Sequence, residues 1–193
     1  VDTYDGDNVR TNVWFRGNGE VGQIQAALGT ADYNIPEYYG YNQSGQVTWK
    51  GEAWEQSESR ETNYYYDGLG NLTSVLDPNG KTTSYVYDKL GRVTSVTDAL
   101  GNQTLYQYDA FGNQTAVRDA RGYWTYSYYD NKGQLWRTTD ASGVNTDTSY
   151  TRFGEVANVS RAGATTSFQY DKAGRVTRST DALGFFETYA YDL

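Results

Sequence analysis

A short phrase that begins with Tyr-Asp and ends with Gly recurs along most of the chain. It first stands in full at Tyr66, and the leading tyrosines then follow at steps of 21, 21, 21, 21, 20 and 21 residues as far as Tyr191. A second phrase, Asp-x-x-Gly, lies at mid-period, for example at residues 98–101. Fixed self-similarity of this length is typical of repeat architectures, in which each unit packs mainly on its neighbours. We therefore look for the function in an array of units and not in one pocket.

Each repeat carries two turn signals and two short strand signals. In Tyr-Asp-x-x-Gly the aspartate can accept hydrogen bonds from backbone N–H groups two residues on, and the glycine supplies a positive φ. The intervening segments, such as 92–97 and 102–108, are rich in β-branched and aromatic residues. The sequence therefore predicts an all-β fold: an array of antiparallel β-hairpins of about 21 residues each. Such an array should form a long coiled sheet, a tube or a segment of a shell.

The turn chemistry assigns a structural role to the Tyr, Asp and Gly of five phrases. These residues are Tyr66, Asp67, Gly70, Tyr87, Asp88, Gly91, Tyr108, Asp109, Gly112, Tyr129, Asp130, Gly133, Tyr170, Asp171 and Gly174. A second aromatic residue often precedes the leading tyrosine by two positions, as Tyr85 precedes Tyr87, and residues two apart share a face of a strand. We expect a ladder of rings on one face. Trp124, Tyr126 and Tyr128 have the opposite parity, which predicts a bulge or a local reorientation in the fourth repeat.

The first third of the chain follows the same theme less strictly. Residues 41–49 and 15–21 fit the phrase at longer spacings of 25 and 26 residues. No Ser/Gly/Pro-rich linker separates the parts, so we divide the chain into irregular repeats at 1–65 and regular repeats at 66–193, continuous with each other. Because residues 191–193 begin another phrase, we expect the sequence to belong to a longer chain.

The composition disfavours several classes of function. A formal net charge of -8 at pH 7 disfavours nucleic acid as a partner, because clustered lysines and arginines hold phosphates. No stretch approaches the ~18 continuous apolar residues of a membrane-spanning helix, so we expect no membrane span. Histidine and cysteine are both absent, which removes the common nucleophile–base pairs and thiolate metal sites. We expect a protein that is not an enzyme and that binds no cofactor.

The repeated phrase resembles that of the YD-repeat, or Rhs-repeat, family. The family pattern is Tyr-Asp-x-x-Gly-[Asn/Arg]-[Leu/Val]-Thr, then Asp-x-x-Gly, then Tyr-x-Tyr-Asp; residues 66–193 match it strongly and 15–65 weakly. Members include bacterial Rhs and toxin-complex shell proteins, wall-associated proteins and teneurins. The resemblance implies a strip of hairpins that spirals into a hollow shell, which in the bacterial toxins encloses a toxic polypeptide. The motif that ends such shells by self-cleavage is lacking; residues 77–80 are similar to it but lie in a repeat turn.

Turn aspartates recur once per period and could supply oxygen ligands to calcium. Neighbouring turns should lie roughly 10 Å apart, which is too far for them to share one ion. Capping of each turn by its own aspartate is therefore favoured, and no metal site is predicted. The aspartates concerned are Asp77, Asp98, Asp119 and Asp140.

Two surface chemistries remain as alternatives to purely structural roles. Exposed aromatic and amide side chains could bind carbohydrate, although a structural ladder of rings is favoured. The tryptophans to test are Trp14, Trp49, Trp54, Trp124 and Trp136. Five Asn-x-Ser/Thr sequons could accept N-glycans, although turn chemistry followed by a β-former explains them as well. They begin at Asn42, Asn71, Asn102, Asn113 and Asn158.

These patterns together predict a structural module of a secreted or cell-surface protein that builds a β-sheet wall. Its expected partners are further repeats of the same or identical chains and, as the resemblance implies, an enclosed toxin polypeptide. Two alternatives stay open. The first is a self-assembling extracellular fibre or filament, and the second is an adhesion module that binds glycans or another cell surface.

Overall fold

The computed structural model describes residues 2–4, 10–15, 21–27, 37–53 and 59–192, with side-chain surroundings for 39–51 and 60–192. Every regular element in these ranges is a β-strand. The strands are β1 (Asp2–Tyr4), β2 (Arg10–Phe15), β3 (Val21–Ala27), β4 (Glu37–Tyr41), β5 (Val47–Ala53), β6 (Ser59–Tyr66), β7 (Leu72–Leu76), β8 (Thr82–Tyr87), β9 (Val93–Thr97), β10 (Gln103–Tyr108), β11 (Gln114–Arg118), β12 (Trp124–Tyr129), β13 (Leu135–Thr139), β14 (Asn145–Tyr150), β15 (Val156–Arg161), β16 (Ala164–Tyr170), β17 (Val176–Thr180) and β18 (Phe186–Thr188).

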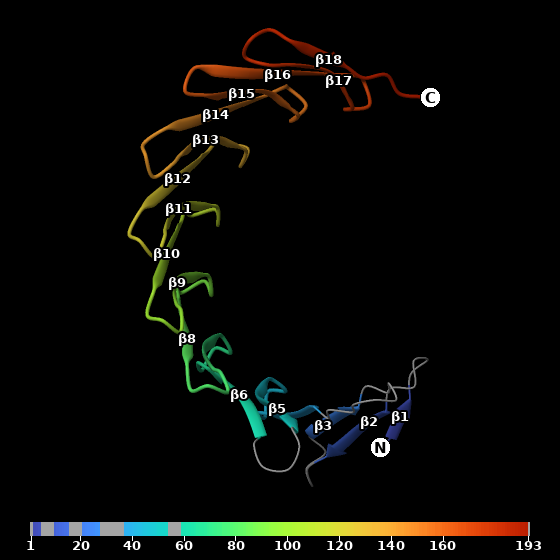
Figure 1. The fold of residues 1–193 in the computed structure, drawn as a ribbon, viewed down its shortest axis with the longest axis vertical. Helices are drawn as coiled ribbons and strands as arrows, with labels where there is room; N and C mark the ends of the chain where they lie inside the picture. The colour runs from blue at the N-terminus through green and yellow to red at the C-terminus, as the bar shows by residue number, and fades with distance from the viewer. Residues whose placement is uncertain (1, 5–9, 16–20, 28–36, 54–58, 193) are drawn as a thin grey trace. The chain divides into compact units, whose positions relative to one another are not determined.

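The chain divides into two compact units, Val1–Gln103 and Thr104–Leu193. In each unit, every strand pairs antiparallel with the strand that follows it in the chain. Figure 1 shows the result within each unit as a single layer of successive hairpins. The predicted all-β array of antiparallel hairpins is confirmed. Within the described ranges, no helix has the length and apolar character that crossing a bilayer requires.

The hairpins led by Tyr41, Tyr66, Tyr87, Tyr108, Tyr129, Tyr150 and Tyr170 share one β-bulge. In the β8–β9 pair, Val86 lies opposite Ser95 and Tyr87 lies opposite Val93, so that Thr94 is an extra residue on β9. The same shift occurs in the irregular first third, where Phe15 lies opposite Val21 and Tyr41 lies opposite Val47. The loosely spaced repeats therefore keep the register of the regular ones.

The fourth repeat has this common bulge and no further distortion. Its register shifts between Tyr128 and Tyr129, as in the other repeats. The local reorientation expected from its aromatic parity is therefore absent in the pairing of β12 with β13. Successive side chains on a strand point to opposite faces. Trp124, Tyr126 and Tyr128 therefore lie on the face opposite to that of the leading tyrosine, Tyr129.

The face that carries the leading tyrosines, here called the tyrosine face, takes the place of a core. Tyr85 pairs with Val96 on this face, and Tyr106 pairs with Val117 in the same way. These side chains are half-buried by one another. Full burial in the described part is confined to small residues such as Ala116, which is 2% exposed. Paired strands of the single layer therefore bury these side chains only in part, and no large side chain of the described part is fully buried.

One hairpin turn explains the single 20-residue step between leading tyrosines. Strands β15 and β16 are joined through Ala162 and Gly163 alone, since Arg161 pairs directly with Ala164. Both turn residues have positive φ, 50° and 85°. This combination is typical of the two-residue type I′ turn, which replaces the longer Asp-x-x-Gly turn of the other repeats.

Candidate functional site: the tyrosine-led turns

The aspartate of each phrase holds its turn together through its carboxylate. Asp88 Oδ1 accepts hydrogen bonds from the backbone N–H groups of Leu90 (2.9 Å) and Arg92 (3.1 Å). Gly91 closes the turn at a φ of 75°, and its N–H donates to the Asp88 carbonyl at 3.1 Å. Glycine adopts this conformation without the steric cost that a side chain imposes. The structure thus places the predicted aspartate and glycine in one compact turn.

The second carboxylate oxygen binds the side chain four residues further on, a partner that the sequence analysis did not identify. Arg92 Nε donates to Asp88 Oδ2 at 2.7 Å. Asparagines make the equivalent bond in three other turns, namely Asn71 to Asp67, Asn102 to Asp98 and Asn113 to Asp109. The signal that could have revealed this role is the recurrence of Asn or Arg directly after the turn glycine.

These hydrogen bonds favour the ionised carboxylates. The side chain and the backbone N–H of Arg92, with the N–H of Leu90, hold the pKa of Asp88 below its ordinary value. The Asn71 side chain and backbone N–H lower the pKa of Asp67 in the same way. The negative charges of Asp67 and Asp88 are therefore stabilised by the fold itself.

Among the described repeats, two form the turn without an aspartate. Asn42 Oδ1 accepts the N–H groups of Ser44 and Gln46, both at 3.0 Å. In another repeat, Thr151 Oγ1 accepts the N–H of Phe153 at 3.1 Å. Each described tyrosine-led turn therefore has a side-chain oxygen at this position, which is charged in some repeats and neutral in others.

The leading tyrosine joins neighbouring hairpins. The Tyr87 hydroxyl donates to the Leu72 carbonyl at 2.8 Å, and thus links the last residue of β8 to the first residue of β7. Other leading tyrosines make the equivalent bond, among them Tyr66, Tyr129, Tyr150, Tyr170 and Tyr191. Burial raises the pKa of Tyr87, because the anion would lose hydration there. A phenylalanine at this position would leave a carbonyl without its partner.

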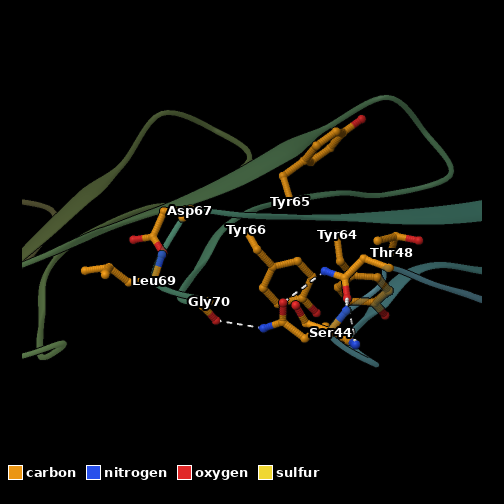
Figure 2. A pocket seen from close by; sticks show the side chains of 11 residues that line it. Ser44, Thr48, Tyr64, Tyr65, Tyr66, Asp67, Leu69 and Gly70 are labelled. Carbon is orange, nitrogen blue, oxygen red and sulfur yellow. Dashed lines mark hydrogen bonds between the residues drawn. The ribbon is translucent and has the colours of Figure 1, made fainter.

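The contact between two neighbouring hairpins is here called a joint. Figure 2 shows one joint, where the Asn42 turn lies beside the Asp67 turn. A shallow pocket of ≈ 740 Å³ separates the two turns. The Gln46 side chain crosses it, and Gln46 Nε2 donates to the Gly70 carbonyl at 2.8 Å. The Tyr64 and Tyr66 rings lie on one side of the strand, and the Tyr65 ring lies on the other. In the second unit, an equivalent pocket of ≈ 560 Å³ separates the Asp109 and Asp130 turns.

The mid-period aspartates also cap their own turns. Asp98 Oδ1, for example, accepts the N–H groups of Leu100 and Asn102 at 2.8 and 2.9 Å. The same pattern is found at Asp77, Asp119 and Asp140. The described residues contain no group of three or more acidic, His or Cys side chains that could hold a metal ion.

The five tryptophans have different environments. Trp49 covers Gly40 on the neighbouring strand so closely that a Cβ on Gly40 would overlap the indole, which indicates a packing role. Trp124 stacks on Tyr126, with ring centroids 6.0 Å apart and an interplanar angle of 16°. The ring centroids of Trp136 and Tyr128 lie 6.0 Å apart, and Trp136 is 38% exposed. Trp14 belongs to β2, where side chains are not described, and Trp54 lies outside the described residues.

All five sequon asparagines use their side-chain amides within the fold. Asn71, Asn102 and Asn113 donate to turn aspartates, as described above. Asn42 Nδ2 donates to Gln46 Oε1, and Asn158 Nδ2 donates to Ser149 Oγ, each at 2.9 Å. Each of these nitrogens has a second hydrogen that a glycan could replace, so the hydrogen bonds do not decide the question and N-glycosylation stays a prediction.

Comparison with known proteins bears on the repeat and on the fold. The family model of the RHS repeat matches residues 66–102, 87–123 and 150–185. The structure is similar to TcdB2-TccC3 without its hypervariable C-terminal region (TM-score 0.59, 12% identity) and to the Photorhabdus luminescens Tc holotoxin pore (TM-score 0.58, 12% identity). Each likeness covers 94% of this chain but only 12% of the other chain. At this identity the likeness shows the fold alone. A comparison with curated proteins finds no match.

Proposed function

Since this chain belongs to the RHS repeat family, we propose that it is a structural segment of a β-sheet wall and that this wall encloses a polypeptide cargo. The wall is the part that the repeats themselves supply, and a longer parent chain would supply the cargo. Such a wall would act outside the cell or on its surface. The repeated joint between neighbouring hairpins is the observation that carries it.

The joint supports a wall because it adds one unit to the next without a layered core. Each hairpin contributes a ladder of backbone hydrogen bonds, a capped turn and a tyrosine hydroxyl that reaches the preceding hairpin, as Tyr87 reaches Leu72. Every repeat can dock on its neighbour by the same contacts, so the length of the sheet is free to grow. A sheet of many strands twists, and the twist makes it curve around an interior.

The same contacts support a function without catalysis. The sequence has neither histidine nor cysteine. The turn aspartates accept backbone N–H groups and hold ion pairs or amides, as Asp88 holds Arg92. A carboxylate engaged in this way is poorly suited to act as a general acid or base, because its pKa is lowered and its oxygens are occupied.

Electron microscopy of the polypeptide as its native host produces it would test the proposal. We expect hollow particles of one fixed size, with additional density inside. Limited proteolysis should degrade the enclosed polypeptide only after the particle is opened at low pH. Solid globular particles would contradict the proposal that the chain forms a β-sheet wall.

A self-assembling fibre is the alternative that the same images would identify. The repeated joint suits end-to-end addition of identical chains as well as closure, since one strand edge can pair with another. Particles of indefinite length with a regular repeat would support the fibre and exclude the closed shell. A dependence of particle length on protein concentration would support the same conclusion.

A further inference from the structure

The fourth repeat lacks the tyrosine–valine pair that the second and third repeats carry on the tyrosine face. Ser127 pairs with Thr138 at the position where Tyr85 pairs with Val96 in the second repeat. The half-buried pair of ring and branched side chain is thus replaced by two small polar residues. Departures from the pattern of a repeat at the expense of packing are expected where a site has another use.

The bulky residues of this repeat lie on the opposite face and form a cluster, here called the aromatic patch: Trp124, Tyr126, Tyr128 and Trp136. Trp124 and Tyr126 stack at 6.0 Å, and Tyr128 and Trp136 meet at 6.0 Å with an angle of 48°. Tyr126, Tyr128 and Trp136 are 40%, 43% and 38% exposed. A pocket of ≈ 500 Å³ opens beside these three rings, with the buried Ala116 and the Gln107 side chain also lining it.

The other repeats show that these hairpins do not need aromatic residues at such positions. Trp136 is the extra residue of the bulge, and its counterparts in the three preceding repeats are Thr73, Thr94 and Thr115. Tyr128 precedes a leading tyrosine, and its counterpart in the preceding repeat is Gln107. The aromatic patch is therefore a local concentration of rings on a face where the preceding repeats carry mostly small and polar side chains, with Tyr65 and Val86 as single large residues.

The polar groups beside the aromatic patch are an ion pair, an amide and one further carboxylate. Asp109 lines the pocket, and its carboxylate accepts hydrogen bonds from the Phe111 N–H and from the backbone and side chain of Asn113. Arg137 and Asp147 form a bidentate ion pair, in which Arg137 Nη2 donates to Asp147 Oδ2 at 2.9 Å and Arg137 Nε donates to Asp147 Oδ1. The Arg137 guanidinium also lies 4.9 Å from the centroid of the Trp136 ring. The Gln107 amide makes no hydrogen bond to the described residues. The site thus offers ring faces, an amide, a carboxylate and a neutralised ion pair. The carboxylate disfavours anionic ligands, and these groups together suit an uncharged ligand with many hydroxyl groups.

We propose that the aromatic patch binds a neutral saccharide. The apolar C–H face of a sugar ring would stack on Tyr128 and Trp136, and its hydroxyls would bond to Gln107 and to the edge of the Arg137–Asp147 pair. The pocket volume falls within the range of about 300–1,000 Å³ that is usual for small-ligand sites. A stable protein interface requires about 800 Å² from each partner, and the polar surroundings supply little apolar area for one. This activity is additional to the wall function.

Binding to cellohexaose, chitohexaose and mannohexaose, measured by titration calorimetry and tryptophan fluorescence on the full chain, tests the proposal. Trp136→Thr and Tyr128→Gln place in the fourth repeat the residues that other repeats carry there, so both variants should fold. We expect at least one neutral probe to bind, and each variant to weaken that binding about tenfold or more. Tyr65→Gln is the matched control, because Tyr65 is an exposed tyrosine at the position of Tyr128 in the first repeat; it should change the affinity by less than about twofold.

The proposal is overturned if none of the neutral probes binds at millimolar concentration. It is also overturned if Trp136→Thr and Tyr128→Gln bind as well as the original chain, or if Tyr65→Gln weakens binding equally. Preferential binding of an anionic glycan such as heparin would contradict the assignment of a neutral saccharide to this site. Melting curves of all variants establish that they retain the fold.

Discussion

At the scale of single residues, the turn glycines are required for their backbone conformation and not for space. Gly112 has a φ of 95°, and a Cβ built on it would meet no atom within 4 Å. The cost of a side chain at this position is therefore conformational. We predict that Gly112→Val lowers the free energy of unfolding by about 1–3 kcal/mol, as measured by chemical denaturation.

Gly68 provides the control for this prediction. It also lies in a tyrosine-led turn with open space around it, but its φ is not positive. Gly68→Val should therefore change the free energy of unfolding by no more than about 0.5 kcal/mol. If both variants were equally destabilised, loss of flexibility or turn polarity would explain the effect and the φ argument would fail.

Ala162 is the one described residue other than glycine with a positive φ, 50°. Asparagine tolerates this conformation better than alanine, and Asn-Gly is the preferred sequence for a two-residue hairpin turn. We predict that Ala162→Asn raises the free energy of unfolding by about 0.5–1 kcal/mol. Thermal melting should detect the gain, whereas Ala110→Asn, in a turn position with negative φ, should give none. A lower melting temperature for Ala162→Asn would count against the turn type.

Sequence reasoning was strongest for residues whose role depends only on the local chain. Asp88 and Gly91 could be placed in a turn because the aspartate bonds and the positive φ involve neighbouring residues. The partner of the second carboxylate oxygen, Arg92, was missed, although Asn or Arg follows several turn glycines. A contact between side chains cannot be derived from turn propensity alone.

At the scale of the hairpin, the leading tyrosine acts between units. The Tyr87 hydroxyl bonds to the Leu72 carbonyl, whereas the Tyr85 hydroxyl makes no hydrogen bond to the described residues. Tyr87→Phe should therefore lower the free energy of unfolding by about 1 kcal/mol, the usual contribution of one such bond. Tyr85→Phe keeps the ring and should have a smaller effect in the same denaturation experiment. Equal effects of both substitutions would indicate that the ring alone matters.

In the fourth repeat the aromatic side chains lie on the opposite face of the sheet. This change shows how much of a strand's structure can be predicted from its sequence. The sequence shows that Trp124, Tyr126 and Tyr128 have the opposite parity to the leading tyrosines. Parity alone allows two outcomes: the strand shifts its register, or the side chains change face. The register of β12 with β13 follows the common bulge, so the side chains change face. Strand pairing, which depends on the whole hairpin, decided between the two.

At the scale of the whole molecule, the turn aspartates make the stability of the fold depend on pH. Hydrogen bonds lower the pKa of Asp88, Asp98 and Asp109 in the folded chain. The unfolded chain, with aspartate pKa values near about 3.9, takes up protons first as the pH falls. Stability from these groups is therefore present above that pH and is lost as the pH falls through the lowered folded values. We predict that the melting temperature falls below about pH 4.

Asparagine substitutions provide the control for the acid dependence. Asn42 already caps a turn with an uncharged oxygen. The triple variant Asp67→Asn, Asp88→Asn and Asp98→Asn should keep the turns and show a shallower loss of melting temperature between neutral and acidic pH. An unchanged slope would mean that other carboxylates govern acid unfolding.

The sequence by itself determined the period, the hairpin, the turn residues and the all-β class, because these follow from neighbouring residues and recur in every repeat. The tertiary structure decided what each side chain reaches beyond its own turn: the Tyr87 hydroxyl to the preceding hairpin, and Trp136 to Tyr128 on the opposite face. The physical reason is that these contacts depend on the register between strands. Register results from all the backbone hydrogen bonds and bulges of a hairpin acting together, and no single residue specifies it.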